Sequence, residues 1–390
     1  MTIFNTKKNN LLLLSGIFLL GFSLKVAMSQ LGSTHDFGWW KLNLAFFQKG
    51  ESFYNYGRYA YSPFWIYLLN IIDQINIPYF GGIDTFRYKM IFILNLFDFL
   101  IFYLILRNYS LKVGLIFFLS PISIFISGHH NQFDNIAIFF GFLAILLIEK
   151  RKKNEIKYLG LFFLGISLCA KHVLFLLPIW LAFKEKNYVN KFIYVVIPYF
   201  IFLISFLPYL EDYKGIIENV FLNPSYNNGP FWGLFAPKVL HMYFPKISMF
   251  IFAMICAGFY FLKYNVRNTF FFYLICVVIF SSGIYNHYLA IPLLALSVFW
   301  NIKYFYYTLL CISLYLLDGD ALGLGSKIFS NFFEWDIRST RILYHPIILM
   351  LFLGLLDSLF GKKVVNFYYK RVYDFFIINI KKQIQFKRIK

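Results

Sequence analysis

Apolar residues fill long runs of the chain, and short polar segments separate these runs. The runs lie near residues 11–31, 60–77, 89–106, 112–127, 135–148, 158–183, 190–210, 247–262, 268–285, 287–300, 303–317 and 343–360. A bilayer-crossing helix needs about 20 apolar residues, so the shorter runs require tilt, a thinned bilayer or burial inside a bundle. The pattern predicts an all-α, polytopic membrane protein with about 12 spanning or half-spanning helices, none of them charged at its centre.

Composition and charge support the membrane class. Of the 390 residues, 60% are hydrophobic and 14% are charged, whereas charged residues make up about a quarter of a typical soluble domain. The formal net charge of +19 would also suit a nucleic-acid-binding protein. The basic residues, however, lie at the ends of apolar runs and in the C-terminal tail, as expected at an anionic membrane surface. We therefore predict membrane lipids as partners and no nucleic acid.

The cysteines and the N-terminal run exclude other classes. All four cysteines lie inside apolar runs without a paired spacing, so we predict neither a disulfide framework nor a metal site. The run 11–31 is about as long as a full span and lacks a small-residue cleavage pattern. We therefore interpret it as a first transmembrane helix and not as a signal peptide.

The distribution of lysine and arginine among the short loops predicts which side of the membrane each loop faces. By this rule the basic segments 149–157 and 361–390 and the N-terminus are cytoplasmic. A simple alternation of spans places 149–157 on the opposite side. We therefore expect run 60–77 to be a juxtamembrane or re-entrant element of the first outer loop.

Run 158–183 needs a second correction, because basic segments flank it on both sides. It should go out and return as two half-helices of about a dozen residues each, buried in the bundle, with Lys171 and His172 at the turn. The prediction is a single transmembrane domain over 1–360 with both termini cytoplasmic. The basic, aromatic tail 361–390 is either an interfacial element or a partly disordered segment.

With this topology the polar segments converge on the outer face. His35 and Asp36 follow the first helix, and polar residues near 129–135, 171–172 and 285–287 open on the same side. A transporter would be expected to spread polar groups through the bilayer midplane. A one-sided site instead predicts chemistry on a lipid-borne substrate whose head group lies at the outer surface.

Several segments also resemble a known family. The stretch "STHDFGWWKLNLAFF" with "FYNYGRYAYSPFWIYLLN" resembles the first outer loop of polyprenyl-phosphate-sugar-dependent glycosyltransferases of the GT-C fold. The greatest likeness is to the dolichyl-phosphate-glucose glucosyltransferases of N-glycan assembly. "GHHNQFDN", "AKHVLFLLPIW", "GPFWGL" and "FSSGIYNHYLAIPLL" are similar to later elements of that family, in the same order over about residues 11–300. Asn131 stands where the family has Phe, Asp134 stands where it has Asn, and the arginine of its Arg-Gly-Leu loop is absent.

The resemblance implies an inverting hexosyltransferase of GT-C-like fold. The donor would be a polyprenyl-phosphate-linked sugar, and the acceptor a lipid-linked or cell-surface glycan or glycolipid on the non-cytoplasmic face. The membrane would be the cell inner membrane, or the endoplasmic reticulum in a eukaryote. A single carboxylate serves as base in such a reaction, and we assign this role to Asp36. The alternative is that Asp36 is a solvated loop acid beside His35.

Phosphate binding calls for cations or hydrogen-bond donors. The candidates for the donor phosphate are Lys171, His172, His129, His130, His287 and Arg58. An intramembrane lysine is a functional hypothesis by default, but Lys171 could instead pair with Asp134 or Asp36 to hold the bundle. Since adjacent helical residues point in different directions, at most one of the two neighbouring histidines should reach the substrate.

The candidates for sugar or acceptor binding are Gln132, Asp134, Asn227, Asn228 and Trp232. Asp134 could equally cap a helix that begins at Asn135, and the Asn-Asn-Gly-Pro segment is equally a turn signal. Asp318 and Asp320 flank a glycine, which favours a turn over a metal site. We predict no metal and no cofactor. The competing functions are a lipid-linked glycan flippase or similar transporter, and a polysaccharide polymerase.

Overall fold

The computed structural model describes residues 7–57, 59–79, 81–150, 154–222, 230–235, 246–319, 321–329 and 341–361. Within these ranges the secondary structure is helical and contains no β-strand, so the predicted all-α class is confirmed. The longer helices are α1 (Lys7–Ser29), α2 (His35–Gln48), α4 (Pro63–Gln74), α5 (Thr85–Asn108), α8 (Asp134–Glu149), α9 (Asn154–Ala170), α11 (Tyr188–Ile204), α15 (Lys246–Tyr260), α16 (Val266–Ile279), α18 (Ile302–Leu317) and a last helix, Tyr344–Gly361.

Shorter elements connect these helices. The short α-helices are α3 (Phe53–Tyr56), α6 (Leu111–Phe118), α7 (Pro121–Phe125), α10 (Leu177–Phe183), α12 (Tyr213–Ile216), α13 (Pro230–Phe235), α17 (Leu293–Val298) and α19 (Leu324–Phe329). The 3-10 and π turns are η1 (Ile126–His130), η2 (His172–Leu174), η3 (Leu207–Asp212), η4 (Ile217–Phe221), η5 (Phe261–Lys263), η6 (Asn286–Ala290) and η7 (Arg341–Leu343).

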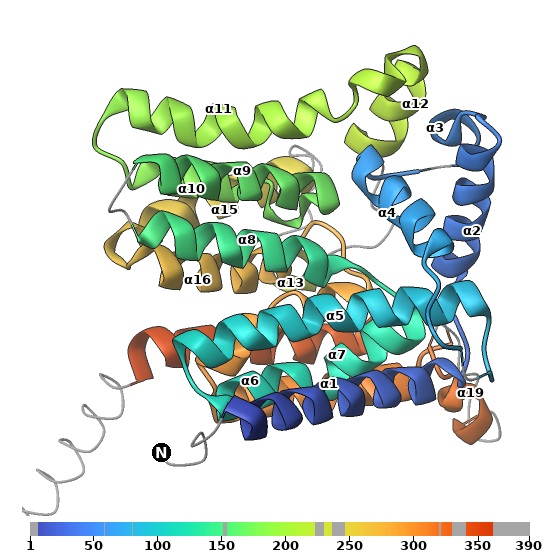
Figure 1. Cartoon of the computed structure of the whole chain (residues 1–390). Helices are drawn as coiled ribbons and strands as arrows, with labels where there is room; N and C mark the ends of the chain where they lie inside the picture. Colours follow the sequence, from blue (N-terminus) through green and yellow to red (C-terminus); the bar gives the residue numbers. More distant parts are fainter. Residues whose placement is uncertain are drawn as a thin grey trace, which may run out of the picture.

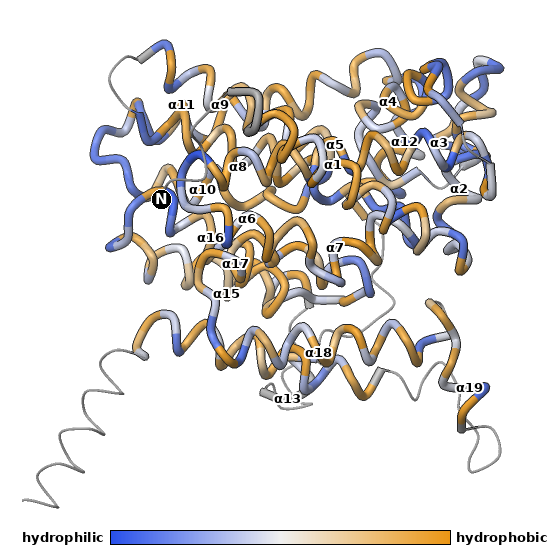
Figure 2. Tube along the Cα trace, turned by 60° about the horizontal axis from the view of Figure 1, so that its bottom comes forward, coloured by the Kyte–Doolittle hydropathy of each residue, from blue (hydrophilic) through white to orange (hydrophobic). Residues whose placement is uncertain are grey.

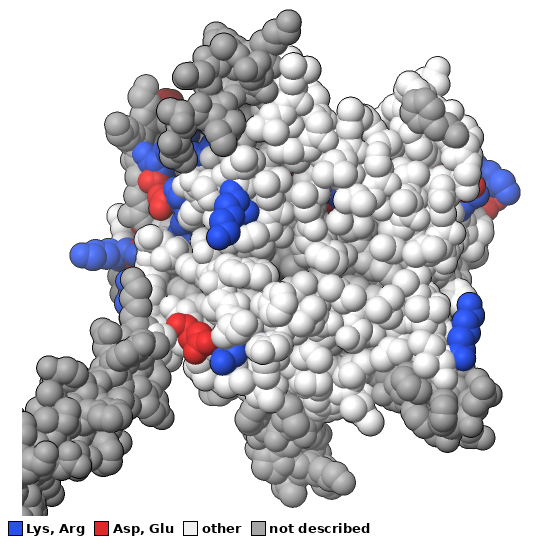
Figure 3. All heavy atoms as spheres, turned by 90° about the horizontal axis from the view of Figure 1, so that it is seen from below, with Lys and Arg blue, Asp and Glu red and all other residues white. Residues whose placement is uncertain are grey.

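Among the described residues, three helices are long and apolar enough to cross a membrane, and the number rises to six if each of three bent helix pairs is one span. The helices α1, α5, α8, α9 and α11 run in roughly the same direction across the bundle, and each packs against the next in that order (Figure 1). Hydrophobic residues fill the middle of these helices, and hydrophilic residues gather in the connections (Figure 2). On the face shown in Figure 3, most charged side chains lie toward the two ends of the helices, with a largely uncharged belt between them.

One end of the bundle carries a layer of short helices. There α2, α3, α4 and α12 lie across the ends of the long helices (Figure 1), and we call this the Asp36 end because Asp36 lies in the first turn of α2. The α4 helix occupies the run 60–77, where the sequence predicts a juxtamembrane element. It begins with Pro63 after Ser62, whose hydroxyl accepts a hydrogen bond from the Phe64 amide, which is a typical helix start.

The run 158–183 is broken at the predicted turn. A bend of 119° separates Glu155–Ala170 from His172–Phe183, and Lys171 lies at the break with an extended backbone (φ −159°, ψ 136°). The break divides the run into residues 158–170 and His172–Phe183, the second arm consisting of η2 and α10, so the predicted division into two arms of about a dozen residues each is confirmed. Pro178 lies in the first turn of α10, where it fits a helix start but would interrupt a longer one.

The statement that no apolar run is charged at its centre is wrong, because Asp98 lies in the middle of run 89–106. Lys25 of α1 and Asp98 of α5 form an ion pair at 2.6 Å, and both side chains are fully buried. Because the two opposite charges neutralise each other, neither helix presents an isolated charge to its apolar surroundings.

Candidate active site

A cavity of about 1470 Å³ lies at the Asp36 end of the bundle. Five of the residues predicted from the sequence line it: Asp36 of α2, His130 of η1, Lys171 and His172 at the α9–α10 bend, and His287 of η6. These residues come from four segments that are far apart in the sequence. The fold therefore brings one carboxylate, one ammonium and three imidazoles to a single cavity.

Asp36 is the half-buried carboxylate of this group. It lies in the first turn of α2, where the helix dipole favours a negative charge. Its Oδ2 accepts a hydrogen bond of 2.5 Å from Gln132 Nε2. Burial raises the pKa of Asp36 above its ordinary value of 3.8, and the positive charge of Lys171 and the bond from Gln132 oppose this effect. Asp36 therefore has the raised proton affinity that suits a general base.

Lys171 forms a buried ion pair with Asp134. Its Nζ lies 2.8 Å from Asp134 Oδ2 and donates a second hydrogen bond, of 3.3 Å, to Gln132 Oε1. One of the two alternatives that the sequence left open for Lys171, pairing with Asp134, is thus present in the structure. The same lysine also lines the cavity. Since an ammonium group has three donors and these contacts use two, one N–H is left to face a ligand.

Gln132 and Asp134 are placed differently from their predicted roles. Both side chains are 1% exposed, and neither lines the cavity, so sugar binding does not fit their position. Asp134 also does not cap a helix that starts at Asn135. The α8 helix begins at Asp134 itself, after Phe133, and no side chain caps it. Instead, Asp36, Gln132, Lys171 and Asp134 form one continuous chain of contacts.

The adjacent histidines differ in environment. His130 lines the cavity, and its Nε2 has no hydrogen-bond partner among the described residues. His129 is 1% exposed and stacks on Phe125, with ring centroids 4.9 Å apart. Since His129 does not line the cavity, phosphate binding does not fit its position.

Aromatic rings support the polar groups. Phe133 stacks on Trp65 with centroids 3.7 Å apart, and Trp40 packs edge-on against both rings at 5.7 and 5.9 Å. The Lys171 ammonium lies 5.0 Å from the centroid of Phe133 and 5.8 Å from that of Tyr61, so two rings stabilise its charge. Because Trp40 belongs to α2 and Trp65 to α4, this packing holds these two short helices of the Asp36 end against the turn that precedes α8.

The cavity also has an apolar part, which we call the apolar limb. Its residues are Phe175, Leu176, Phe202, Phe221, Ile247, Phe250 and Ile251, from the α9–α10 bend and from α11, η4 and α15. Four of these seven side chains, those of Phe175, Phe221, Ile247 and Ile251, are among the exposed large hydrophobic residues. The cavity therefore extends from its polar end to the apolar surface of the bundle.

The sequence analysis missed several lining residues. Tyr61, Tyr285, Asn286 and Asp318 line the cavity, and Asn286 Nδ2 donates to Asp318 Oδ2 at 2.6 Å. The sequence pattern had favoured a turn at Asp318 over a metal site. Tyr285 stacks on His287 with centroids 5.8 Å apart, and this neighbourhood was visible in the segment "YNH".

Other predicted residues lie elsewhere. Trp232 of α13 donates its Nε1–H to the Phe280 carbonyl at 2.8 Å and does not line the cavity, so this position does not fit sugar stacking. Arg58, Asn227, Asn228 and Asp320 lie outside the described residues, as do residues 362–390 of the tail. Within the described ranges, no cluster of three or more His, Cys, Asp or Glu side chains could hold a metal ion.

No protein-family model matches the chain, and no curated protein is detectably similar to it. The case for a function therefore rests on the geometry and chemistry of the cavity.

Proposed function

We propose that the chain is an integral-membrane hexosyltransferase. It would move a hexose from a polyprenyl-phosphate donor to a lipid-linked or cell-surface glycan acceptor, with inversion, at the Asp36 end of the bundle. The proposal includes a GT-C-like arrangement of about 12 spanning or half-spanning helices, with the Asp36 end on the non-cytoplasmic face and both termini in the cytoplasm.

The observation that carries the proposal is the two-part cavity. Its polar end holds a carboxylate and several cationic or hydrogen-bonding groups, and its apolar limb reaches the hydrophobic surface of the bundle. A polyprenyl-phosphate sugar has the same division into a polar head and an apolar chain. The cavity of about 1470 Å³ also exceeds the roughly 300–1,000 Å³ of a typical small-ligand pocket, so an acceptor can lie beside the donor.

Asp36 is the proposed base. Its Oδ2 accepts the Gln132 bond, so Oδ1 is the oxygen left to take a proton from an acceptor hydroxyl. The acceptor oxygen then bonds to C1 of the sugar, and the bond from C1 to the phosphate oxygen breaks. The polyprenyl phosphate leaves with that electron pair, and the proton stays on Asp36 until water removes it. Attack from the face opposite the phosphate inverts the anomeric centre.

Lys171 and the cavity histidines are the proposed phosphate ligands. Charge increases on the phosphate as it leaves, and donors placed beforehand stabilise that charge most effectively. The remaining N–H of Lys171 supplies one charge-assisted bond, and His130, His172 and His287 supply imidazole N–H donors from the surrounding walls. Asp134 holds the ammonium group in place through the 2.8 Å ion pair.

The test is a transfer assay with purified protein in liposomes. Polyprenyl-phosphate-linked hexoses would be supplied one at a time with lipid-linked glycan extracts, and the products analysed by mass spectrometry. We expect one donor to be consumed and one hexose to be added per acceptor. Addition of many residues would indicate a polymerase instead. Movement of lipid-linked glycan between leaflets without a new bond would indicate a flippase.

The matched control is a second acid at the same end of the bundle. Asp73 of α4 accepts a hydrogen bond of 3.0 Å from Gln48 and does not line the cavity. Asp73→Asn should transfer hexose at the wild-type rate, whereas Asp36→Asn should not. Equal rates in the two variants would remove Asp36 from the mechanism.

A further inference from the structure

The turn between α7 and α8 has an irregular backbone although it is buried. Residues Ile126–His130 form a π turn, and Asn131 follows in the left-handed region with φ 55°. Such a conformation in a residue other than glycine is rare and persists where the surroundings enforce it. This turn carries His130 into the cavity and Gln132 onto Asp36. The contacts that hold the turn therefore influence the geometry of the candidate base.

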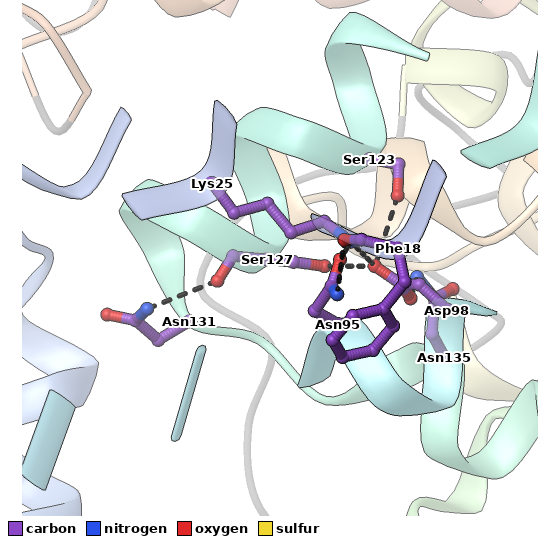
Figure 4. Close-up of polar contacts among 8 residues, drawn as sticks. All are labelled: Phe18, Lys25, Asn95, Asp98, Ser123, Ser127, Asn131 and Asn135. Carbon is purple, nitrogen blue, oxygen red and sulfur yellow. Dashed lines mark hydrogen bonds and ion pairs between the residues drawn. The ribbon is translucent and has the colours of Figure 1, made fainter. Parts of the chain in front are cut away.

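One carboxylate holds the turn on both sides (Figure 4). Asp98 Oδ2 accepts hydrogen bonds from Ser127 Oγ at 2.9 Å and from Ser123 Oγ at 3.3 Å. Both serines precede Asn131 in the chain. Asp98 Oδ1 accepts a bond of 2.5 Å from Asn135 Nδ2, in the first turn of α8. The donors come from α7, η1 and α8, and they all converge on a single side chain of α5.

Lys25 places an opposite charge beside this carboxylate inside the bundle. Its Nζ donates to Asp98 Oδ2 at 2.6 Å and to Asn95 Oδ1 at 3.0 Å (Figure 4). The backbone contact at the same place is close, because a Cβ atom on Gly128 would lie 2.5 Å from the Lys25 carbonyl oxygen. The turn thus packs directly on α1 at the residue that neutralises Asp98.

Arg87 holds the turn from another direction. Its Nε donates to Asn131 Oδ1 at 2.8 Å, and its Nη2 donates to the carbonyls of Gly128 and His129 at 3.2 and 3.0 Å. The same guanidinium donates to the carbonyl of Gly32 at 2.5 Å, in the segment that leads to Asp36. Arg87 therefore links the two segments that carry Gln132 and Asp36.

We propose that Asp98, neutralised by Lys25, is a positioning residue that fixes the turn 126–132 and through it the hydrogen bond from Gln132 to Asp36. The inference rests on the proposed function in that Asp36 is taken as the base. A carboxylate suits this task because it accepts hydrogen bonds, donates none and has about four acceptor sites. An asparagine in its place would direct an NH₂ group at a neighbouring donor, so the array of contacts would rearrange.

The experiment uses the full chain in liposomes and compares two doubly neutralised variants. Lys25→Met/Asp98→Asn removes the ion pair beneath the turn without leaving a lone charge. Glu149→Gln/Arg267→Gln is the control, because it neutralises a 2.5 Å ion pair elsewhere in the bundle, whose side chains are partly exposed. The measurements are the melting temperature, amide hydrogen exchange of residues 126–135, and kcat and KM for the polyprenyl-phosphate donor.

We expect the first variant to melt close to wild type, because neutral replacement of a buried pair is often tolerated. Exchange in the turn should rise about tenfold, and kcat should fall about tenfold to a hundredfold at a nearly unchanged KM, since a small misplacement of a catalytic group is enough for such a loss. The control should change none of these. If the first variant does not accumulate, Ser127→Ala replaces it, because this substitution removes one hydrogen-bond donor and no charge. The same measurements are then made on Ser127→Ala.

Three results would contradict the role proposed for Asp98 or the proposed function. Unchanged exchange in the turn would show that Asp98 does not hold it. Raised exchange with unchanged kcat would show that Asp98 holds the turn without positioning the base. Wild-type protein that transfers no hexose from any donor would overturn the proposed function instead, and the exchange measurement would then still decide whether Asp98 holds the turn.

Discussion

Replacing Lys171 by methionine tests the polar cluster beside the cavity most directly. The substitution retains an unbranched apolar stem and removes the ammonium, whose Nζ lies 2.8 Å from Asp134 Oδ2. Asp134 is 1% exposed, and its other oxygen has no hydrogen-bond partner among the described residues. The variant therefore contains a buried carboxylate that has lost its ion-pair partner.

The expected loss of stability follows from this burial. Breaking a buried pair by removing one partner costs about 3–5 kcal/mol. An unfolding entropy of about 2.1 cal/mol/K per residue, taken over 390 residues, amounts to about 0.8 kcal/mol/K. Lys171→Met should therefore melt about 4–6 °C below wild type. Lys171→Met/Asp134→Asn removes the unpaired charge and should recover most of that difference.

The assay combines melting in detergent with donor dependence of transfer. Lys41→Met is the matched control, because Lys41 pairs with Asp84 at 2.9 Å while the two side chains are 50% and 39% exposed. Such an exposed pair contributes little to stability, so this variant should have the melting temperature of the wild type. The recovered double variant should still use the donor poorly, since it lacks the proposed phosphate ligand. A Lys171→Met protein as stable as wild type would refute the assignment of a stabilising buried pair. Full donor use by the double variant would exclude Lys171 from phosphate binding.

Four further predictions concern the base, its pKa and the topology. Asp36→Asn should insert normally and lose about two to four orders of magnitude in transfer rate; near-normal turnover would contradict its role. Because burial raises the pKa of Asp36 and the base must be deprotonated, wild-type kcat/KM should fall with decreasing pH around a midpoint above 3.8. Gln132→Leu removes a bond that lowers this pKa, so its midpoint should move to higher pH, and a move to lower pH would be inconsistent with the contact. In a Cys256→Ser background, a cysteine at the exposed Glu51 should react with an impermeant reagent from outside and one at the exposed Lys186 should not, whereas the reverse pattern would invert the proposed topology.

The residues that converge at the cavity were the part of the site most accessible from sequence. Asp36 follows the first apolar run, Lys171 lies at the predicted break in run 158–183, and His287 begins run 287–300, so the loop-charge rule predicts that they share one face. This reasoning depends only on counting spans and on the preference of Lys and Arg for one side. It therefore identifies which segments meet, but not which atoms touch.

The contacts between these segments could not be predicted in the same way. The direction of Gln132 depends on the left-handed backbone of Asn131 (φ 55°), a conformation that asparagine permits and does not require. The apolar limb is built from Phe, Leu and Ile, and a chain with 52 phenylalanines offers no way to distinguish lining residues from core. Asp98 did leave a signal, because a single acid inside a 24-residue apolar helix indicates a functional or paired residue.

In the proposed reaction, the apolar limb makes the rate of transfer depend on the concentration of donor within the bilayer. Its exposed side chains, among them Phe221 and Ile247, open the cavity toward the hydrophobic surface of the bundle. In the proposed reaction the donor would then arrive by diffusion within the plane of the bilayer. Saturation should follow the mole fraction of donor in the lipid. Adding empty vesicles would leave the rate unchanged, whereas adding donor-free lipid to the same vesicles would slow it by surface dilution.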